Sequence, residues 1–113
     1  MVSAPYPYDT HAPKPLTEAQ LTAAIAHLPG WRADDGRLRA EFCVGRTNVR
    51  PLFAAVTAVE NATNHHARVT ILYDTVSFEL TTHDAGDRVT ARDTAVAAVL
   101  GALAAEYGAP PNR

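Results

Sequence analysis

The sequence is poor in cysteine, in lysine and in long apolar runs. Cys43 is the only cysteine among the 113 residues, so no intramolecular disulfide is possible and the cytoplasm is the expected compartment. No apolar run approaches the roughly 20 residues needed to cross a bilayer, and no secretory signal pattern opens the chain. Lys14 is the only lysine, and the arginines are scattered rather than clustered into a stripe that could follow phosphates. These absences argue against a membrane or a nucleic acid as partner.

What is present is the composition of one globular domain. Hydrophobic residues make up 47% of the chain, charged residues 19%, and the formal net charge is -2. A chain of this length can build one core but not two. Four prolines among the first fifteen residues predict a flexible N-terminal arm over residues 1–15. The domain is then expected over residues 16–108, followed by a tail over 109–113.

Local signals predict three helices and four strands. A capping box over residues 17–20 begins a first helix that should run to about His27, and Pro51 suits the first turn of the second. Thr90 begins the third helix. Alternating polar and apolar residues predict two pairs of strands between these helices. The order helix, two strands, helix, two strands, helix predicts an α+β fold, with a four-stranded antiparallel sheet and three helices packed on one face.

The feature most indicative of function is the doublet His65-His66, with His83 further along the chain. The ordinary pKa of histidine, about 6.5, allows proton transfer near neutral pH, so three imidazoles in one segment suggest acid/base chemistry. Neighbours on a helix point about 100° apart. Both members of the doublet can therefore face one cavity only if the second helix ends there. His83 directly follows the fourth strand, where it could meet them.

Each of these residues also has a purely structural interpretation. His65 and His66 could simply favour the C-terminus of a helix, Tyr73 could belong to the core, and Asp93 could only cap its helix. Asp93 suits both roles, because a carboxylate held by backbone N–H groups at the start of a helix can still orient a nearby histidine.

Taken together, the residues resemble the pterin-4a-carbinolamine dehydratases. The similarity spans roughly residues 16–107 and rests on two signature stretches and on the spacing of single residues. The stretches are Leu28-Pro29-Gly30-Trp31 and Leu80-Thr81-Thr82-His83-Asp84. The single residues are His65, His66, Tyr73, His83 and Asp93.

The resemblance implies a specific reaction. Enzymes of this family remove water from 4a-hydroxytetrahydropterin to give quinonoid dihydropterin, in the tetrahydrobiopterin recycling that supports aromatic amino acid hydroxylases. The family positions that match His65, His66 and His83 line the pterin pocket, and Asp93 belongs to the same motif. The resemblance implies assembly into homodimers or homotetramers. It implies no metal and no bound cofactor.

A division of roles follows as a hypothesis. The elimination needs an acid at the leaving hydroxyl and a base at N5. We expect His66 and His83 to form this pair and His65 to hold the pterin. The residues expected to bind substrate or support the site are Asp93, Asn61 and Tyr73.

Two positions depart from the family pattern. Asn61 stands where the family usually has an acidic or otherwise charged residue, and Ala67 replaces the usual proline after the doublet. Asparagine cannot offer the charged, two-oxygen acceptance that a carboxylate gives an aminopyrimidine edge. Loss of the proline adds a backbone N–H donor after His66.

Three other functions stay open, and the two departures motivate the first of them. The first alternative is a repurposed enzyme that acts on another small molecule. The second is a non-catalytic binding or assembly module of the same fold. The third is a zinc or iron site built from the three histidines and Asp93.

Overall fold

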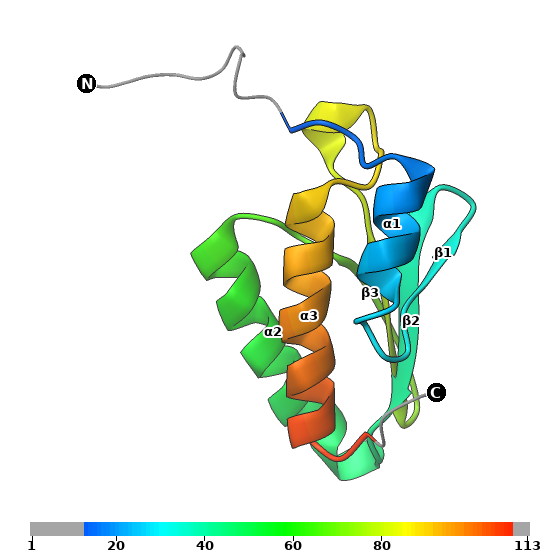
Figure 1. The fold of residues 1–113 in the computed structure, drawn as a ribbon. Coiled ribbons are helices and arrows are strands. Elements are labelled where there is room, and N and C mark those ends of the chain that lie inside the picture. Colours follow the sequence, from blue (N-terminus) through cyan, green and yellow to red (C-terminus); the bar gives the residue numbers. More distant parts are fainter. Residues whose placement is uncertain (1–12, 110–113) are drawn as a thin grey trace.

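Three helices cover one face of a four-stranded antiparallel sheet (Figure 1). The computed structural model describes residues 13–109, so the predicted arm over 1–15 and tail over 109–113 lie mostly outside the described residues. In chain order the elements are α1 (Glu18–Ile25), β1 (Arg32–Asp34), β2 (Arg37–Cys43), η1 (Arg46–Asn48), α2 (Val49–Thr63), β3 (Arg68–Leu72), β4 (Thr75–Leu80), η2 (His83–Ala85) and α3 (Ala91–Glu106), where η1 and η2 are short 3-10 helices. This order confirms the predicted α+β architecture.

The strands lie in the order β1-β2-β4-β3, and all three neighbouring pairs are antiparallel. β1 and β2 form a hairpin across Asp35 and Gly36, whose φ angles of 55° and 75° are the left-handed values that such a two-residue turn requires. β2 and β4 are therefore central, while β1 and β3 are the edges. Within residues 13–109, no helix is both long and apolar enough to cross a membrane.

The core lies between the sheet and the helices. Leu38 of β2 and Phe78 of β4 point to the helical side and are 0% and 1% exposed. Leu52 and Val56 of α2 and Leu100 of α3 meet them and are fully buried. Because burial of such a side chain contributes about 1.5–3 kcal/mol, this layer holds α2 and α3 against the sheet.

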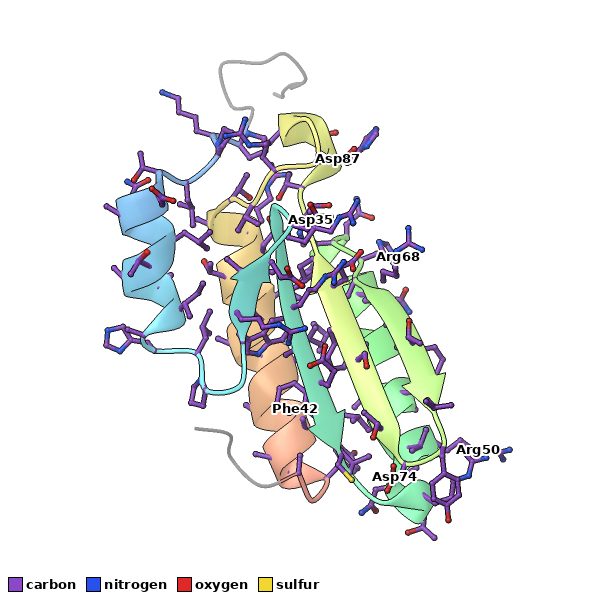
Figure 2. The ribbon with its side chains drawn as sticks, turned by 90° about the vertical axis from the view of Figure 1, so that its right-hand side faces the viewer. Asp35, Phe42, Arg50, Arg68, Asp74 and Asp87 are labelled. Atoms are coloured by element: carbon purple, nitrogen blue, oxygen red, sulfur yellow. The ribbon has the colours of Figure 1, made fainter. Side chains whose placement is uncertain are left out.

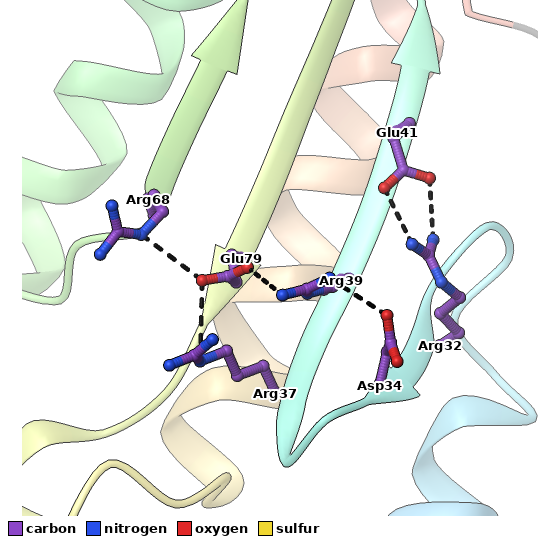
Figure 3. A network of polar contacts seen from close by, with 7 residues as sticks. All are labelled: Arg32, Asp34, Arg37, Arg39, Glu41, Arg68 and Glu79. Atoms are coloured by element: carbon purple, nitrogen blue, oxygen red, sulfur yellow. Dashed lines mark hydrogen bonds and ion pairs between the residues drawn. The ribbon is translucent and has the colours of Figure 1, made fainter.

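The opposite face of the sheet is polar and carries no helix (Figure 2). Its centre is Glu79 of β4, which pairs with three arginines from neighbouring strands, as Figure 3 shows. The partners are Arg39 at 2.8 Å, Arg68 at 3.4 Å and Arg37 at 3.7 Å. Beside them the Glu41 carboxylate accepts two hydrogen bonds from Arg32, which raises the pKa of that guanidinium. Pairs that involve an exposed side chain, such as that of Arg68, contribute little stability.

The predicted helix caps form, and element ends differ by a few residues. Thr17 and Gln20 exchange the two hydrogen bonds of a capping box at α1, but this helix ends at Ile25 rather than near His27. The polar and apolar alternation of the third strand continues to Tyr73, which predicts that residue in the strand, but the strand ends at Leu72. Tyr73 lies in the β3–β4 turn with φ 53°, because Leu72 already pairs with Thr75, the first residue of β4.

Candidate active site

Helix α2 ends immediately before the histidine doublet. Asn64 is its C-cap in the left-handed conformation (φ 54°, ψ 35°), which asparagine tolerates better than most residues. The segment after Asn64 is no longer helical and leads into β3, passing the N-terminal end of α3 (Figure 1). The second helix therefore ends before His65, as it must if both histidines are to face one cavity. The two imidazoles are no longer held about 100° apart, as neighbours on a helix would be.

Three segments meet at this point: the residues after α2, the residues after β4 and the first turn of α3. They surround a cavity of about 340 Å³. All three predicted histidines line it. The lining residues are Asn64, His65, His66, Thr81, Thr82, His83, Asp84 and Arg92.

Asp93 is the buried anchor of the site. Its side chain is 0% exposed, and its Oδ1 lies 2.6 Å from Nε2 of His65, whose side chain is 12% exposed. Its Oδ2 accepts hydrogen bonds from the Thr82 hydroxyl at 2.7 Å and from the Thr90 backbone N–H at 2.8 Å. Asp93 therefore caps α3 and orients His65 at the same time, as its sequence position allowed.

This contact fixes the hydrogen on the His65 ring. A carboxylate oxygen can only accept, so Nε2 carries the proton toward Asp93 and Nδ1 is the nitrogen left for proton exchange. The Thr82 hydroxyl gives its only hydrogen to Asp93, so the Thr90 hydroxyl, 2.7 Å away, donates to Thr82. A chain of oriented groups thus supports one imidazole from behind.

The other two histidines are much more accessible. His66 is exposed, and the His83 side chain is 93% exposed with only a 3.4 Å contact from Nδ1 to the Asp87 carboxylate. Neither ring is held as His65 is. The site therefore combines one clamped imidazole with two open ones, an arrangement that can separate two proton-transfer roles.

Two predicted site residues do not reach the cavity. Asn61 is exposed on α2 and is not among the lining residues. Tyr73 is 67% exposed in the β3–β4 turn, where its ring lies 5.8 Å from the Arg46 guanidinium. Figure 2 places its neighbour Asp74 at one end of the sheet and Asp87, near His83, at the other. The structure thus brings together His65, His66, His83 and Asp93, but not Asn61 or Tyr73.

Thr82, Thr90 and Arg92 also belong to the site, although no role in it was predicted for them. Thr82 directly precedes His83, and Thr90 forms the capping box with Asp93, so both were visible in the sequence as motif neighbours. What the sequence did not indicate is that both hydroxyls turn inward onto one buried network.

A second cavity has a different chemical character. It measures about 280 Å³ and lies between α3 and the segment before β1. Its walls are mostly apolar, including Leu28, Trp31 and Phe42, and His27 is its only titratable residue.

Within residues 13–109, no group of three or more His, Cys, Asp or Glu side chains is placed to hold a metal ion. The histidine cavity is therefore the candidate active site.

The fold and the site define the class of this protein: it is an α+β protein with imidazoles clustered at the end of a helix. The sequence profile of the family described as "Pterin 4 alpha carbinolamine dehydratase" matches residues 14–103. The chain belongs to the pterin-4-alpha-carbinolamine dehydratase family.

Individual relatives agree with this assignment. A "Putative pterin-4-alpha-carbinolamine dehydratase" of Streptomyces coelicolor is 34% identical over 97 residues, covering 85% of this chain and 96% of the relative. A protein of the same name from Rhodopseudomonas palustris strain BisB18 is 39% identical over 100 residues, covering 82% and 94%. Among solved structures, a transcriptional coactivator/pterin dehydratase from Brucella melitensis matches with a TM-score of 0.74 and 25% identity, covering 80% of this chain and 98% of that one.

Proposed function

We propose that this protein removes water from 4a-hydroxytetrahydropterin and gives quinonoid dihydropterin, in the recycling of tetrahydrobiopterin. The observation that carries the proposal is the cavity lined by His65, His66 and His83, in which one imidazole is held by a buried carboxylate. Family membership supplies the substrate class, and the cavity supplies groups that can perform the chemistry. No cofactor takes part in the proposed reaction.

The reaction is an elimination that needs two proton transfers. The C4a–O bond breaks, and the departing hydroxyl takes a proton from an acid to leave as water. N5 loses its proton to a base, and the freed electron pair forms the N5=C4a double bond. An imidazolium and a neutral imidazole can perform these transfers near neutral pH.

We assign the base to His65, which differs from the sequence-based hypothesis that it holds the pterin. When its Nδ1 takes the N5 proton, the Asp93 carboxylate at Nε2 compensates the positive charge that forms on the ring. His66 and His83, being exposed at the cavity, are then the candidates for the acid.

The departure at Asn61 does not alter the walls of the cavity. Because Asn61 lies outside the lining residues, its lack of charge removes no contact from the space enclosed by the histidines. The charge difference at position 61 therefore gives no reason to prefer an unrelated small molecule as substrate.

The test is the rate of 4a-hydroxytetrahydropterin dehydration, followed by ultraviolet absorbance. We expect the wild-type protein to accelerate the reaction and His65→Ala to lose about 10²-fold or more of that acceleration, the usual loss when a catalytic base is removed. His27→Ala is the matched control, because His27 is exposed and lies outside the cavity, and it should keep the wild-type rate. A wild-type protein that gives no acceleration would contradict the proposed reaction.

We also propose that the protein self-associates through β3, as expected for the family. β3 is an edge strand, and its last residue Leu72 is 77% exposed beside Ile71 at 41%. An apolar edge with unpaired backbone groups favours pairing with another strand. We propose a cytoplasmic location, because a single cysteine is typical of a protein from a reducing compartment.

Leu72→Lys should shift the protein toward the monomer, because a charged side chain on an edge strand opposes pairing. Gel filtration with light scattering measures the mass. Ala33→Lys on β1, the opposite edge, is the control and should not change the mass. A wild-type protein that is monomeric at micromolar concentration would rule out this interface.

A further inference from the structure

One residue of α2 contacts the chain on both sides of the histidine doublet. The backbone carbonyl of Glu60 accepts the N–H of Asn64 at 2.8 Å, and its carboxylate Oε2 accepts the N–H of Ala67 at 3.0 Å. Asn64 precedes His65, and Ala67 follows His66. Glu60 therefore fixes the backbone at both ends of the doublet.

The side-chain contact supplies a hydrogen bond that secondary structure does not. α2 ends at Thr63 and β3 begins at Arg68, so the N–H of Ala67 lies between two elements and outside both of their hydrogen-bond patterns. The half-buried Glu60 carboxylate gives this donor a charged acceptor, which is a stronger partner than a neutral one. A proline at position 67 would have no N–H to give. The hydrogen bond between Glu60 and Ala67 is therefore possible only because position 67 is not proline in this chain.

The pair bears directly on the geometry of the clamped imidazole. His65 lies two residues before Ala67, and its Nε2 must stay 2.6 Å from Oδ1 of Asp93, a residue of a different helix. Asp93 is itself immobilised by Thr82 and Thr90. The segment that carries His65 is joined to α2 through Glu60, so both partners of the His65–Asp93 contact are held from behind.

We propose that Glu60 is a positioning residue of the active site, acting through its bond to Ala67 to aim His65 at Asp93. The inference rests on the proposed function for its kinetic readout but not for its structural one. Glu60 does not line the cavity. Its effect is therefore on the placement of His65, and small misplacements of a catalytic group are costly in rate.

Two substitutions of Glu60 separate the effect of its side-chain length from the effect of its charge. In Glu60→Gln, the amide oxygen has the same reach as the carboxylate and can still accept from Ala67, but the charge is gone. In Glu60→Asp, the charge remains but the side chain is one methylene shorter, so the bond is lost. If Glu60 positions the doublet, Gln resembles the wild type and Asp resembles Glu60→Ala. If Glu60 acts through its charge, Asp resembles the wild type and Gln resembles Glu60→Ala.

The experiment measures two properties of Glu60→Ala, Glu60→Gln and Glu60→Asp. The first is kcat and KM for dehydration, where Ala and Asp should lower kcat about tenfold with a smaller change in KM, and Gln should restore it. The second is the NMR signal of the His65 Nε2 proton, which should move upfield and exchange faster with water in Ala and Asp. Glu106→Ala, an exposed glutamate at the end of α3, is the control and should leave both unchanged.

A double variant tests whether the bond to Ala67 is the cause. Ala67→Pro removes the donor, so adding Glu60→Ala to Ala67→Pro should cause no further change in the His65 signal. A full additional effect would overturn the proposal, and so would a Glu60→Ala protein with wild-type kcat and wild-type His65 signal. If the wild-type protein shows no dehydratase activity, the NMR measurement still decides the positioning role, so the two failures remain distinguishable.

Discussion

Asp93→Asn is expected to leave the protein folded and to lower the rate of pterin dehydration by about 10²–10⁴-fold. The reason is the direction of one hydrogen bond. Asp93 accepts from three donors, and the two at Oδ2 are the Thr82 hydroxyl and the Thr90 backbone N–H. In the asparagine variant, the amide oxygen must occupy the Oδ2 position, because both of these groups donate to it.

The amide nitrogen then faces His65. An amide N–H can only donate, so Nε2 of His65 must become the acceptor and the ring proton must move to Nδ1. Every buried group keeps a partner, which is why the fold should survive. The nitrogen proposed to take the N5 proton is, however, already protonated. Asp93→Asn thus inverts the tautomer of the proposed base with little change in structure.

Kinetics and thermal unfolding together check this result. Asp35→Asn is the matched control, because Asp35 is exposed in the β1–β2 turn and asparagine tolerates its φ of 55°. Asp93→Ala should behave differently from Asp93→Asn: it leaves buried donors unpaired and should lower the free energy of unfolding by about 1–3 kcal/mol for each donor that stays unpaired. Full activity in Asp93→Asn would mean that His65 is not the base.

The fold could be predicted from the sequence because its determinants are local. The capping boxes at Thr17 and Thr90 lie within four residues each, and both form. The alternation along 37–44 and 76–81 predicted the two central strands, since a period of two residues places one set of side chains on the core. The structure has them at Arg37–Cys43 and Thr75–Leu80. The turn at Asp35 and Gly36 depends on the same short-range chemistry, since both residues tolerate positive φ angles.

The site could be predicted only in part, because its contacts are not local. His65 and Asp93 are 28 residues apart, and only the packing of α3 beside the end of α2 brings their side chains together. Spacing along the chain gave no measure of that distance. It also suggested a site role for Tyr73, although the turn at its end of β3 leaves it beside Arg46, away from the histidines.

The departure at Ala67 illustrates the same limit. The sequence indicated that a backbone N–H had been added after the doublet, but not what would accept it. The acceptor is Glu60, seven residues before Ala67. Glu60 directly precedes Asn61, the other position that departs from the family pattern. A helix turn places the Glu60 carboxylate over the segment that follows the helix, and only the geometry of the α2 C-terminus shows this.

His83→Ala should abolish most of the turnover, by about 10²-fold or more, while changing the free energy of unfolding by less than about 0.5 kcal/mol. The two effects separate because the His83 side chain is 93% exposed and its closest polar contact, to Asp87, is 3.4 Å long. Its removal therefore costs little packing. Dehydration kinetics and thermal unfolding measure the two quantities, with His27→Ala as the control for loss of an exposed imidazole.

Turnover that is unchanged in His83→Ala would remove His83 from the mechanism and leave His66 as the only candidate acid. The combination with Asp93→Asn tests the proposed division of labour further. Residues that act as a unit in one transition state give losses that do not add. If His83 donates a proton in the same step in which His65 accepts one, the double variant should lose little more than the more damaged single variant. Losses that multiply fully would instead assign the two imidazoles to separate steps.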